Sequence, residues 1–294
     1  MCDASAAVAL TGHLFAVASD EDSVIRVYSR DKAGAPVQSF NLSAFLDLDE
    51  KKPESDLEGA ARIGDRAYWI TSHGRNRSGR ARPSRERFFA TQTVTNGQGA
   101  QLKGVGQPYE RLLDDLVQDR RLARFNLEAA SLLEPKARGA LNIEGLSATP
   151  EGHLLIGFRN PIPNGMALLV PMLNPDEVIR GASAKFGDPL LLDLGGLGVR
   201  DMAYSEGKYL IIAGPYDGIG PSRLYAWSGG PSPPRLIKHS RLKGLNPEGI
   251  VVYPGTGWNR IQVISDDGKK LINDRPCKEC PPSQQHFRSV WVKP

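Results

Sequence analysis

The sequence has 294 residues, with 37 Lys and Arg against 33 Asp and Glu and a formal net charge of +4. So small an excess of positive charge does not indicate a nucleic acid partner. No apolar run approaches the roughly 18 residues that a membrane helix needs, and no signal peptide pattern opens the chain, so a cytoplasmic protein is expected. The 31 glycines and 22 prolines, with short apolar runs between them, predict an all-β fold of many strands joined by turns.

The three cysteines, Cys2, Cys277 and Cys280, are too few and too unevenly placed to predict a disulfide framework. Cys277 and Cys280 form a Cys-x-x-Cys pair in a proline-rich segment, without a second pair or a histidine partner. Incidental thiols in a surface loop are therefore favoured over a metal or redox site.

Five segments repeat one pattern: a short strand that begins beside a polar or acidic residue, a turn that contains glycine, and a second, more hydrophobic strand. Each segment is typical of a β-hairpin. The number of residues from the third motif position to the end of the second strand is the same in four segments. In the fifth segment it is two residues larger, because the turn at residues 254–259 is longer. These pairs are Ser5 and Asp20, Glu58 and His73, Glu144 and Arg159, Asp201 and Tyr216, and Glu248 and Ser265.

Further strands are predicted after the hairpins, at residues 24–28, 36–45, 87–91, 166–170, 190–194, 224–227, 235–238 and 287–292. Four strands per unit of roughly 50 residues is typical of a β-propeller, and polar terminal caps would be needed for a solenoid, the main alternative. We expect one domain over residues 1–294 with five blades, or six if residues 92–141 hide another. The last unit lacks a strand, so either a strand comes from upstream of Met1 or that blade has three.

Residues 107–135 are predicted to form a helical insertion between blades two and three. Leu113, Leu116 and Val117 share one face of a helix there. Packing of this face against the propeller is favoured over membrane binding.

The acids of the repeat are the main candidate site. Side chains at positions i and i+2 share a strand face, which pairs Asp3 with Ser5, Asp56 with Glu58, Asn142 with Glu144 and Asn246 with Glu248. If the first strands are innermost, their acids converge on one axis, where repelling carboxylates either raise each other's pKa or hold a cation. Oxygen ligands suit Ca²⁺ or Mg²⁺; the alternative is that the acids only accept backbone hydrogen bonds at blade junctions. The predicted metal ligands are Glu58, Glu144, Asp201, Glu248, Asp3 and Asp56.

The ends of the second strands meet the same rim and add His73, Arg159 and Asp266. Six arginines follow within residues 75–87, and arginine forks suit phosphate or carboxylate. The alternative is a solvated flexible loop; nucleic acid is disfavoured because no aromatic residue interleaves the arginines. We predict His73 and Arg159 as catalytic residues, with His73 moving a proton. The predicted substrate-binding residues are Arg75, Arg77, Arg80, Arg159 and Asp266.

Three stretches, residues 55–75, 142–161 and 265–268, resemble the bacterial propeller family catalogued as domain of unknown function 3616, and the likeness covers nearly the whole chain. The resemblance implies the propeller fold and little chemistry. More distantly, the Glu-Gly strand starts are similar to those of esterase-like phytase and calcium-activated nucleotidase propellers, which hold calcium in or near the channel and cleave phosphate esters or anhydrides. Glu58, Glu144 and Glu248 match that pattern, whereas Ser5-Ala and Asp201-Met depart from it.

These observations favour a divalent-metal-dependent hydrolase that acts on a small phosphorylated or otherwise anionic substrate at the channel mouth. The alternative is a non-catalytic propeller that binds a ligand or a protein at the same mouth, because fold does not determine function. The sequence gives no indication of oligomeric state.

Overall fold

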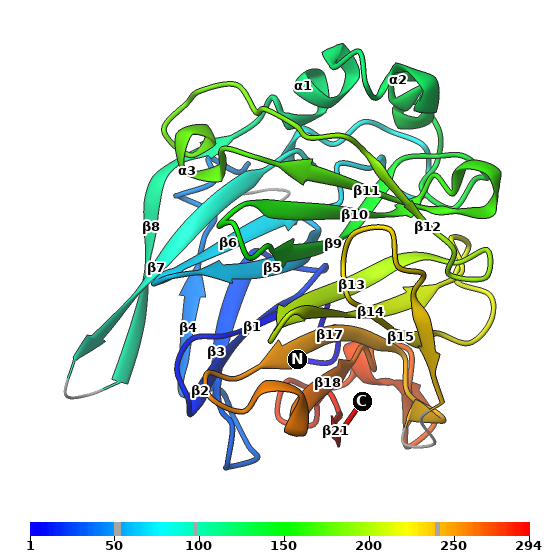
Figure 1. Cartoon of the computed structure of the whole chain (residues 1–294). Coiled ribbons are helices and arrows are strands. Elements are labelled where there is room, and N and C mark those ends of the chain that lie inside the picture. The colour runs from blue at the N-terminus through cyan, green and yellow to red at the C-terminus, as the bar shows by residue number, and fades with distance from the viewer. Residues whose placement is uncertain (50–53, 97–98, 239–241) are drawn as a thin grey trace.

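The computed structural model describes residues 1–49, 54–96, 99–238 and 242–294. Five antiparallel sheets surround a central axis, which confirms the predicted five-bladed β-propeller (Figure 1). Within each blade the strands pair in chain order, so the first strand is innermost. The innermost strands contact their neighbours around the ring, and contact between the first and the last closes it.

The blades have the following bounds. Blade one contains β1 (Ala6–Ala9), β2 (Leu14–Ala18), β3 (Val24–Ser29) and β4 (Gln38–Asn41), and blade two contains β5 (Leu57–Ile63), β6 (Arg66–Thr71), β7 (Phe88–Asn96) and β8 (Gly99–Tyr109). Blade three contains β9 (Asn142–Ala148), β10 (Leu154–Asn160), β11 (Ala167–Met172) and β12 (Leu190–Leu192). Blade four contains β13 (Gly198–Ser205), β14 (Lys208–Gly214), β15 (Arg223–Trp227) and β16 (Arg235–Ile237). Blade five contains β17 (Pro247–Val252), β18 (Ile261–Ser265) and β21 (Ser289–Val292), with the small hairpin β19 (Leu271–Ile272) and β20 (Arg275–Pro276) inserted.

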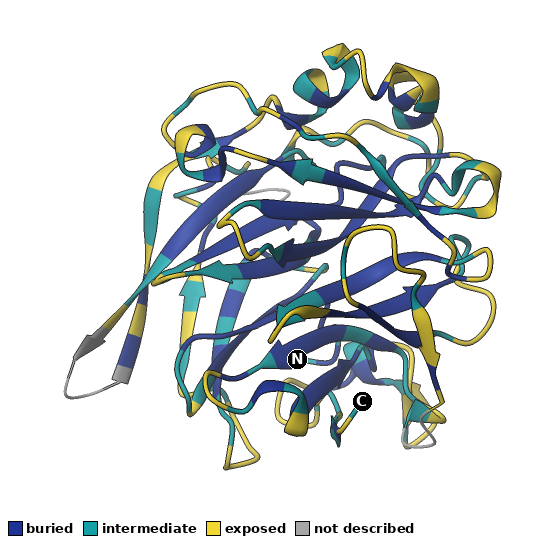
Figure 2. Ribbon diagram, in the orientation of Figure 1, coloured by how far each residue is buried: buried dark blue, intermediate teal, exposed yellow. Residues whose placement is uncertain are grey.

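The apolar core is divided among the blade interfaces (Figure 2). Successive side chains of a strand point to opposite faces, and both faces of a blade are covered by neighbours. In β6, Tyr68 packs into the cluster between blades two and three, whereas Trp69 packs into the cluster between blades one and two. Burying an aromatic side chain of this kind stabilises the fold by about 1.5–3 kcal/mol.

Residues 92–141 contain no sixth blade within the part that the structure describes. They hold the end of β7, all of β8, and the helices α1 (Leu112–Gln118) and α2 (Leu127–Ser131). The helical insertion between blades two and three is confirmed, but residues 107–109, predicted to belong to it, extend β8 instead. Of the predicted face, Leu116 is fully buried, while Leu113 and Val117 pack against the core at its edge. A third short helix, α3 (Pro175–Val178), lies in blade three.

The cysteine prediction was wrong. Cys2 and Cys277 form a disulfide across 275 positions of sequence, and Cys280 is free and buried. Cys2 precedes β1, and Cys277 lies between β20 and β21, so the bond links blade one to blade five where the ring closes. In blade five, the described residues form a sheet of three strands, one of the two arrangements predicted for this blade. None of the described helices is long and apolar enough to cross a membrane.

Candidate functional site

A charged cavity of about 820 Å³ opens at the end of the propeller where the first strands begin. Of the predicted metal ligands it is lined by Asp3, Asp56, Glu58, Glu144 and Glu248, and of the other predicted residues by Arg77, Arg159 and Asp266. At the opposite end of the first strands lies a smaller cavity of about 390 Å³, lined largely by small and apolar side chains. The charged end is therefore the candidate site.

A β-bulge aims the repeated glutamates at this cavity. The pairing of first and second strands shifts by one residue at Glu58, Glu144 and Glu248, so that each glutamate has no direct partner across the hairpin. The next residue is a glycine in each case, and it lies where the neighbouring blade approaches closely. A Cβ on Gly145 would lie 2.6 Å from Val199 Cγ1.

The bulge corrects the prediction for Asp201. In blade four the shift falls on Arg200, so Arg200 is the equivalent of the three glutamates and Asp201 takes the place of the glycine. Asp201 is 2% exposed and does not line the cavity. Its carboxylate accepts hydrogen bonds from the backbone N–H of Met202 (2.8 Å) and of Ile250 (2.6 Å), which ties blade four to blade five.

Arginines bind the glutamates of blades three and five. Glu144 Oε1 is 2.5 Å from Arg159 Nη1, and Glu144 Oε2 is 3.4 Å from Arg200 Nε. Arg200 also pairs with Glu248. Two of the four predicted i, i+2 pairs are hydrogen-bonded, because Asn142 Nδ2 donates to Glu144 (3.0 Å) and Asn246 Nδ2 donates to Glu248 (3.0 Å). Both glutamates are thus held in place by arginine and asparagine side chains.

Glu58 differs from the other two glutamates. It lines the cavity, and it has no hydrogen bond or ion pair with any residue that the structure describes. Burial raises the pKa of Glu58 well above its usual range, and the negative charges of Glu144, Asp56 and Asp20 add to the shift. Mutual repulsion between carboxyls disfavours the ionised form of Glu58.

Asp20 and Asp3 are two further acids that line the cavity. Burial raises the pKa of Asp20 well above its usual range, helped by the charges of Asp56 and Asp266. Burial likewise raises the pKa of Asp3 to about 6, again with Asp266 contributing. Asp266 itself accepts hydrogen bonds from Asn246 Nδ2 (3.1 Å) and Gly268 N (2.8 Å). We define the acidic wall as Asp3, Asp20, Asp56, Glu58 and Asp266.

The acidic wall predicts a pH dependence of stability. The pKa of Asp3 is raised on folding, so its favourable contribution is complete near pH 4 and is lost as pH rises through about 6. We expect Asp3→Asn to raise the free energy of unfolding at pH 7.5 by about 1 kcal/mol after solvent screening is allowed for. Chemical denaturation at pH 4 and at pH 7.5 measures the gain in the free energy of unfolding, and an equal gain at the two pH values would contradict the prediction.

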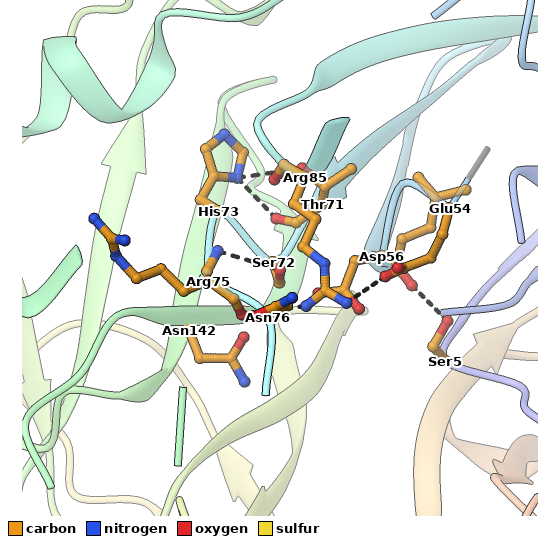
Figure 3. Close-up of polar contacts among 12 residues, drawn as sticks. Ser5, Glu54, Asp56, Thr71, Ser72, His73, Arg75, Asn76, Arg85 and Asn142 are labelled. Atoms are coloured by element: carbon orange, nitrogen blue, oxygen red, sulfur yellow. Dashed lines mark hydrogen bonds and ion pairs between the residues drawn. The ribbon is translucent and has the colours of Figure 1, made fainter. Parts of the chain in front are cut away.

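His73 does not reach the cavity. Its backbone has a φ of 53°, in the left-handed region, and Figure 3 shows the ring directed away from Asp56 and Asn142. The ring is buried, Nδ1 lies 2.8 Å from the carbonyl oxygen of Thr71, and burial lowers the pKa of His73 to about 4. A neutral ring outside the cavity cannot move a proton for a substrate there, so the structure gives no support to the predicted catalytic role of His73.

The arginine-rich segment is divided between structure and cavity. Arg85 pairs with Glu54 and, at 2.9 Å, with Asp56, whose pKa burial raises to about 6 (Figure 3). Arg75 donates from Nε to the carbonyl oxygen of Ser131 (2.9 Å), which fixes the segment to α2. Neither Arg75 nor Arg80 lines the cavity, whereas Arg77 and the unpredicted Arg82 do.

The carboxylates do not form the predicted metal shell. Glu144, Glu248 and Asp56 are bound by arginines, and Asp201 is bound by backbone N–H groups. The described residues include no group of three or more His, Cys, Asp or Glu side chains that could hold a metal ion. Glu144, Glu248 and Asp56, already neutralised by guanidinium groups, suit Ca²⁺ or Mg²⁺ poorly, whereas Asp3 and Glu58 form no ion pair with a residue that the structure describes.

Sequence reasoning missed several residues of the cavity. The one-residue shift at the bulge of blade four conceals Arg200 from a comparison by spacing alone. Asp20 takes the same repeat position as Arg159, but only Arg159 is predicted as a site residue. Lys136, Lys269 and Lys270 also line the cavity. They lie in loops outside the repeat, and no pattern in the sequence identifies them.

A protein-family model matches residues 3–92 and, in an overlapping segment, residues 81–245. The chain belongs to the family described as Protein of unknown function (DUF3616). A search of curated proteins found no match to this DUF3616 chain.

Among solved structures, a glutaminyl cyclase from Myxococcus xanthus is 16% identical, with a TM-score of 0.51 over 89% of this chain and 85% of the other. A GH43 β-1,3-galactosidase solved with galactodeoxynojirimycin is 10% identical, with a TM-score of 0.51 over 99% of this chain and 90% of the other. At these identities the similarity shows the fold that the DUF3616 chain shares with them, and not its activity.

Proposed function

We propose that the charged cavity is the active site of a hydrolase for small anionic esters, working by general acid–base catalysis. The observation that carries this proposal is Glu58, a cavity carboxyl without a partner among the described residues and with a raised pKa. Perturbed carboxyls that line a cavity are candidates for proton transfer.

Glu58 and Asp20 have the properties of an acid and base pair. Burial and neighbouring charge raise both pKa values, and the charge of Asp20 contributes to the shift at Glu58. In our proposal Glu58 holds the proton and Asp20 is ionised, the division of roles that a general acid and a general base need. In the proposed reaction, water adds its oxygen to the electrophilic atom of the ester and the bond to the leaving oxygen breaks. Glu58 gives its proton to the leaving oxygen, and the ionised partner, Asp20, takes the proton from water.

An anionic substrate fits the positive side chains that line the cavity. Arg77, Arg82, Lys136, Lys269 and Lys270 line it, and none of these side chains forms an ion pair with a residue that the structure describes. Unpaired cations around a cavity favour an anion inside it.

The test is turnover of a panel of phosphoesters, phosphoanhydrides and small carboxylate esters, with and without a chelator. We expect hydrolysis of at least one anionic ester, unchanged after complete removal of divalent metal. Loss of all turnover on chelation would contradict the acid–base mechanism and restore the Ca²⁺ or Mg²⁺ predicted from the sequence. Binding of an anion without hydrolysis of any ester would instead support the non-catalytic alternative.

The cytoplasmic location predicted from the sequence stays a prediction. Disulfides are rare in the cytosol and persist in oxidising compartments. The Cys2–Cys277 bond therefore favours an oxidising environment for the folded protein. Trapping of free thiols in intact cells distinguishes an oxidising compartment from the cytoplasm.

A further inference from the structure

One nitrogen of Arg159 is left over by the network that holds the side chain. Arg159 Nε donates to the carbonyl oxygen of Pro215 (3.1 Å), and Nη1 pairs with Glu144 (2.5 Å). Nη2 has no hydrogen-bond partner among the residues that the structure describes. The guanidinium is therefore fixed in place by two of its nitrogens and presents the third to the cavity.

Lys136 presents its ammonium group to the same space. A Cβ on Gly218 would lie 3.2 Å from Arg159 Nη2 and 3.6 Å from Lys136 Nζ. Gly218 has a φ of 78° and is exposed, so no side chain fills the space in front of the two nitrogens. Lys136 follows α2 and Arg159 ends β10, so the folding of blade three and its helical insertion brings them together.

Two further cations, Lys269 and Arg77, line the same cavity. Burial lowers the pKa of Lys136, and the positive charges of Lys269, Arg159 and Arg77 add to the shift. Two acids face the group: Glu134, which binds the backbone N–H of Lys136 (3.0 Å), and Asp217, which binds the backbone N–H of Ile219 (2.9 Å). Neither forms an ion pair with the four cations. A bound anion would relieve the repulsion among them.

The available donors distinguish between kinds of anion. A carboxylate is bound best by the two parallel N–H donors of one arginine fork. Arg159 cannot offer that fork, because Nη1 is already paired with Glu144. Here the donors are one guanidinium nitrogen and ammonium groups that approach from other directions. Such donors suit a phosphoryl group, because its oxygens point in several directions.

We propose that Arg159 Nη2 and Lys136 Nζ, with Lys269 and Arg77 beside them, form a subsite for the phosphoryl group of a phosphate monoester. This subsite rests on the proposed function and narrows its substrate class, with Gly218 leaving the space that the phosphoryl group fills. Arg159 also acts electrostatically on Glu58, and both line the cavity, so an ester whose phosphoryl group is held here lies in the cavity that Glu58 lines.

Isothermal titration calorimetry with inorganic phosphate, and with acetate in parallel, tests the subsite without requiring turnover. We expect phosphate to bind more tightly than acetate, and Lys136→Gln and Lys269→Gln each to weaken phosphate binding at least tenfold. Lys185→Gln, a change on an exposed lysine outside the cavity, is the matched control and should leave the affinity unchanged. Gly218→Asn, which tolerates positive φ, should weaken binding by filling the space.

The outcomes separate the subsite from the reaction. No phosphate binding by the native protein, or equal affinity in the native protein and both lysine variants, would overturn the subsite. Phosphate binding that depends on Lys136 without hydrolysis of any ester would support the subsite and contradict the hydrolase. Hydrolysis at a rate that Lys136→Gln and Lys269→Gln leave unchanged would support the hydrolase and contradict the subsite.

Discussion

Glu58→Gln should lower hydrolysis about 10²–10⁴-fold while making the protein more stable at neutral pH. The rate falls because glutamine has no proton to give to the leaving oxygen. The stability rises because the pKa of Glu58 is raised on folding, so its contribution to the free energy of unfolding is lost as pH rises above the ordinary range of a glutamate. Glutamine keeps the shape of the side chain and stays neutral beside Asp56, Asp20 and Glu144 without having to take up a proton on folding.

The combination of opposite effects is the informative feature. A residue that only supports the fold would lose activity and stability together, whereas an active-site carboxyl held in an unfavourable environment loses activity and gains stability. Turnover and thermal unfolding at pH 7.5 measure the two quantities. Glu144→Gln is a useful comparison, because it breaks the pairs with Arg159 and Arg200 and should destabilise the protein. A Glu58→Gln protein that is less stable at pH 7.5 would contradict our assignment.

Breaking the Cys2–Cys277 bond should lower the free energy of unfolding by about 2–5 kcal/mol. The bond closes a loop of nearly the whole chain, so in the unfolded state it removes more conformations than a short loop would. In the folded state it holds the first blade against the last. Urea denaturation of Cys2→Ser against the oxidised native protein measures the difference.

Cys280→Ser is the control for this experiment, because Cys280 is a buried free thiol and its replacement leaves the disulfide intact. We expect Cys280→Ser to have the smaller effect, and Cys2→Ser to be insensitive to added reductant while the native protein is not. Equal stability of oxidised and reduced native protein would contradict a role for the bond in closing the ring.

The repeat made the fold predictable, since Glu58, Glu144 and Glu248 mark the starts of innermost strands and the spacing to the end of the second strand is the same in four of the five repeats. The site was less predictable because one bulge decides where a side chain points. In blade four the same spacing selects Asp201, yet the bulge turns Arg200 to the cavity and Asp201 into the interface between blades. Spacing in sequence does not show such a shift.

Other features depended on tertiary contacts that no local pattern contains. His73 ends a second strand as Arg159 does, but its left-handed backbone turns the ring away from the cavity. Five of the six predicted metal ligands line one cavity, but Arg159, Arg200 and Arg85 neutralise three of them, and the sixth, Asp201, lies between blades. The partner of Cys2 comes from the other end of the chain and becomes its neighbour only when the ring closes.

The most direct test of the central claim, that the cavity keeps a protonated glutamic acid at neutral pH, is a carbon-detected NMR titration of the glutamate carboxyl groups. We predict one carboxyl that titrates well above the ordinary range and that is missing from the spectrum of Glu58→Gln. If every glutamate carboxyl of the native protein titrates in the ordinary range near pH 4.3, Glu58 is ionised at neutral pH and cannot act as the acid.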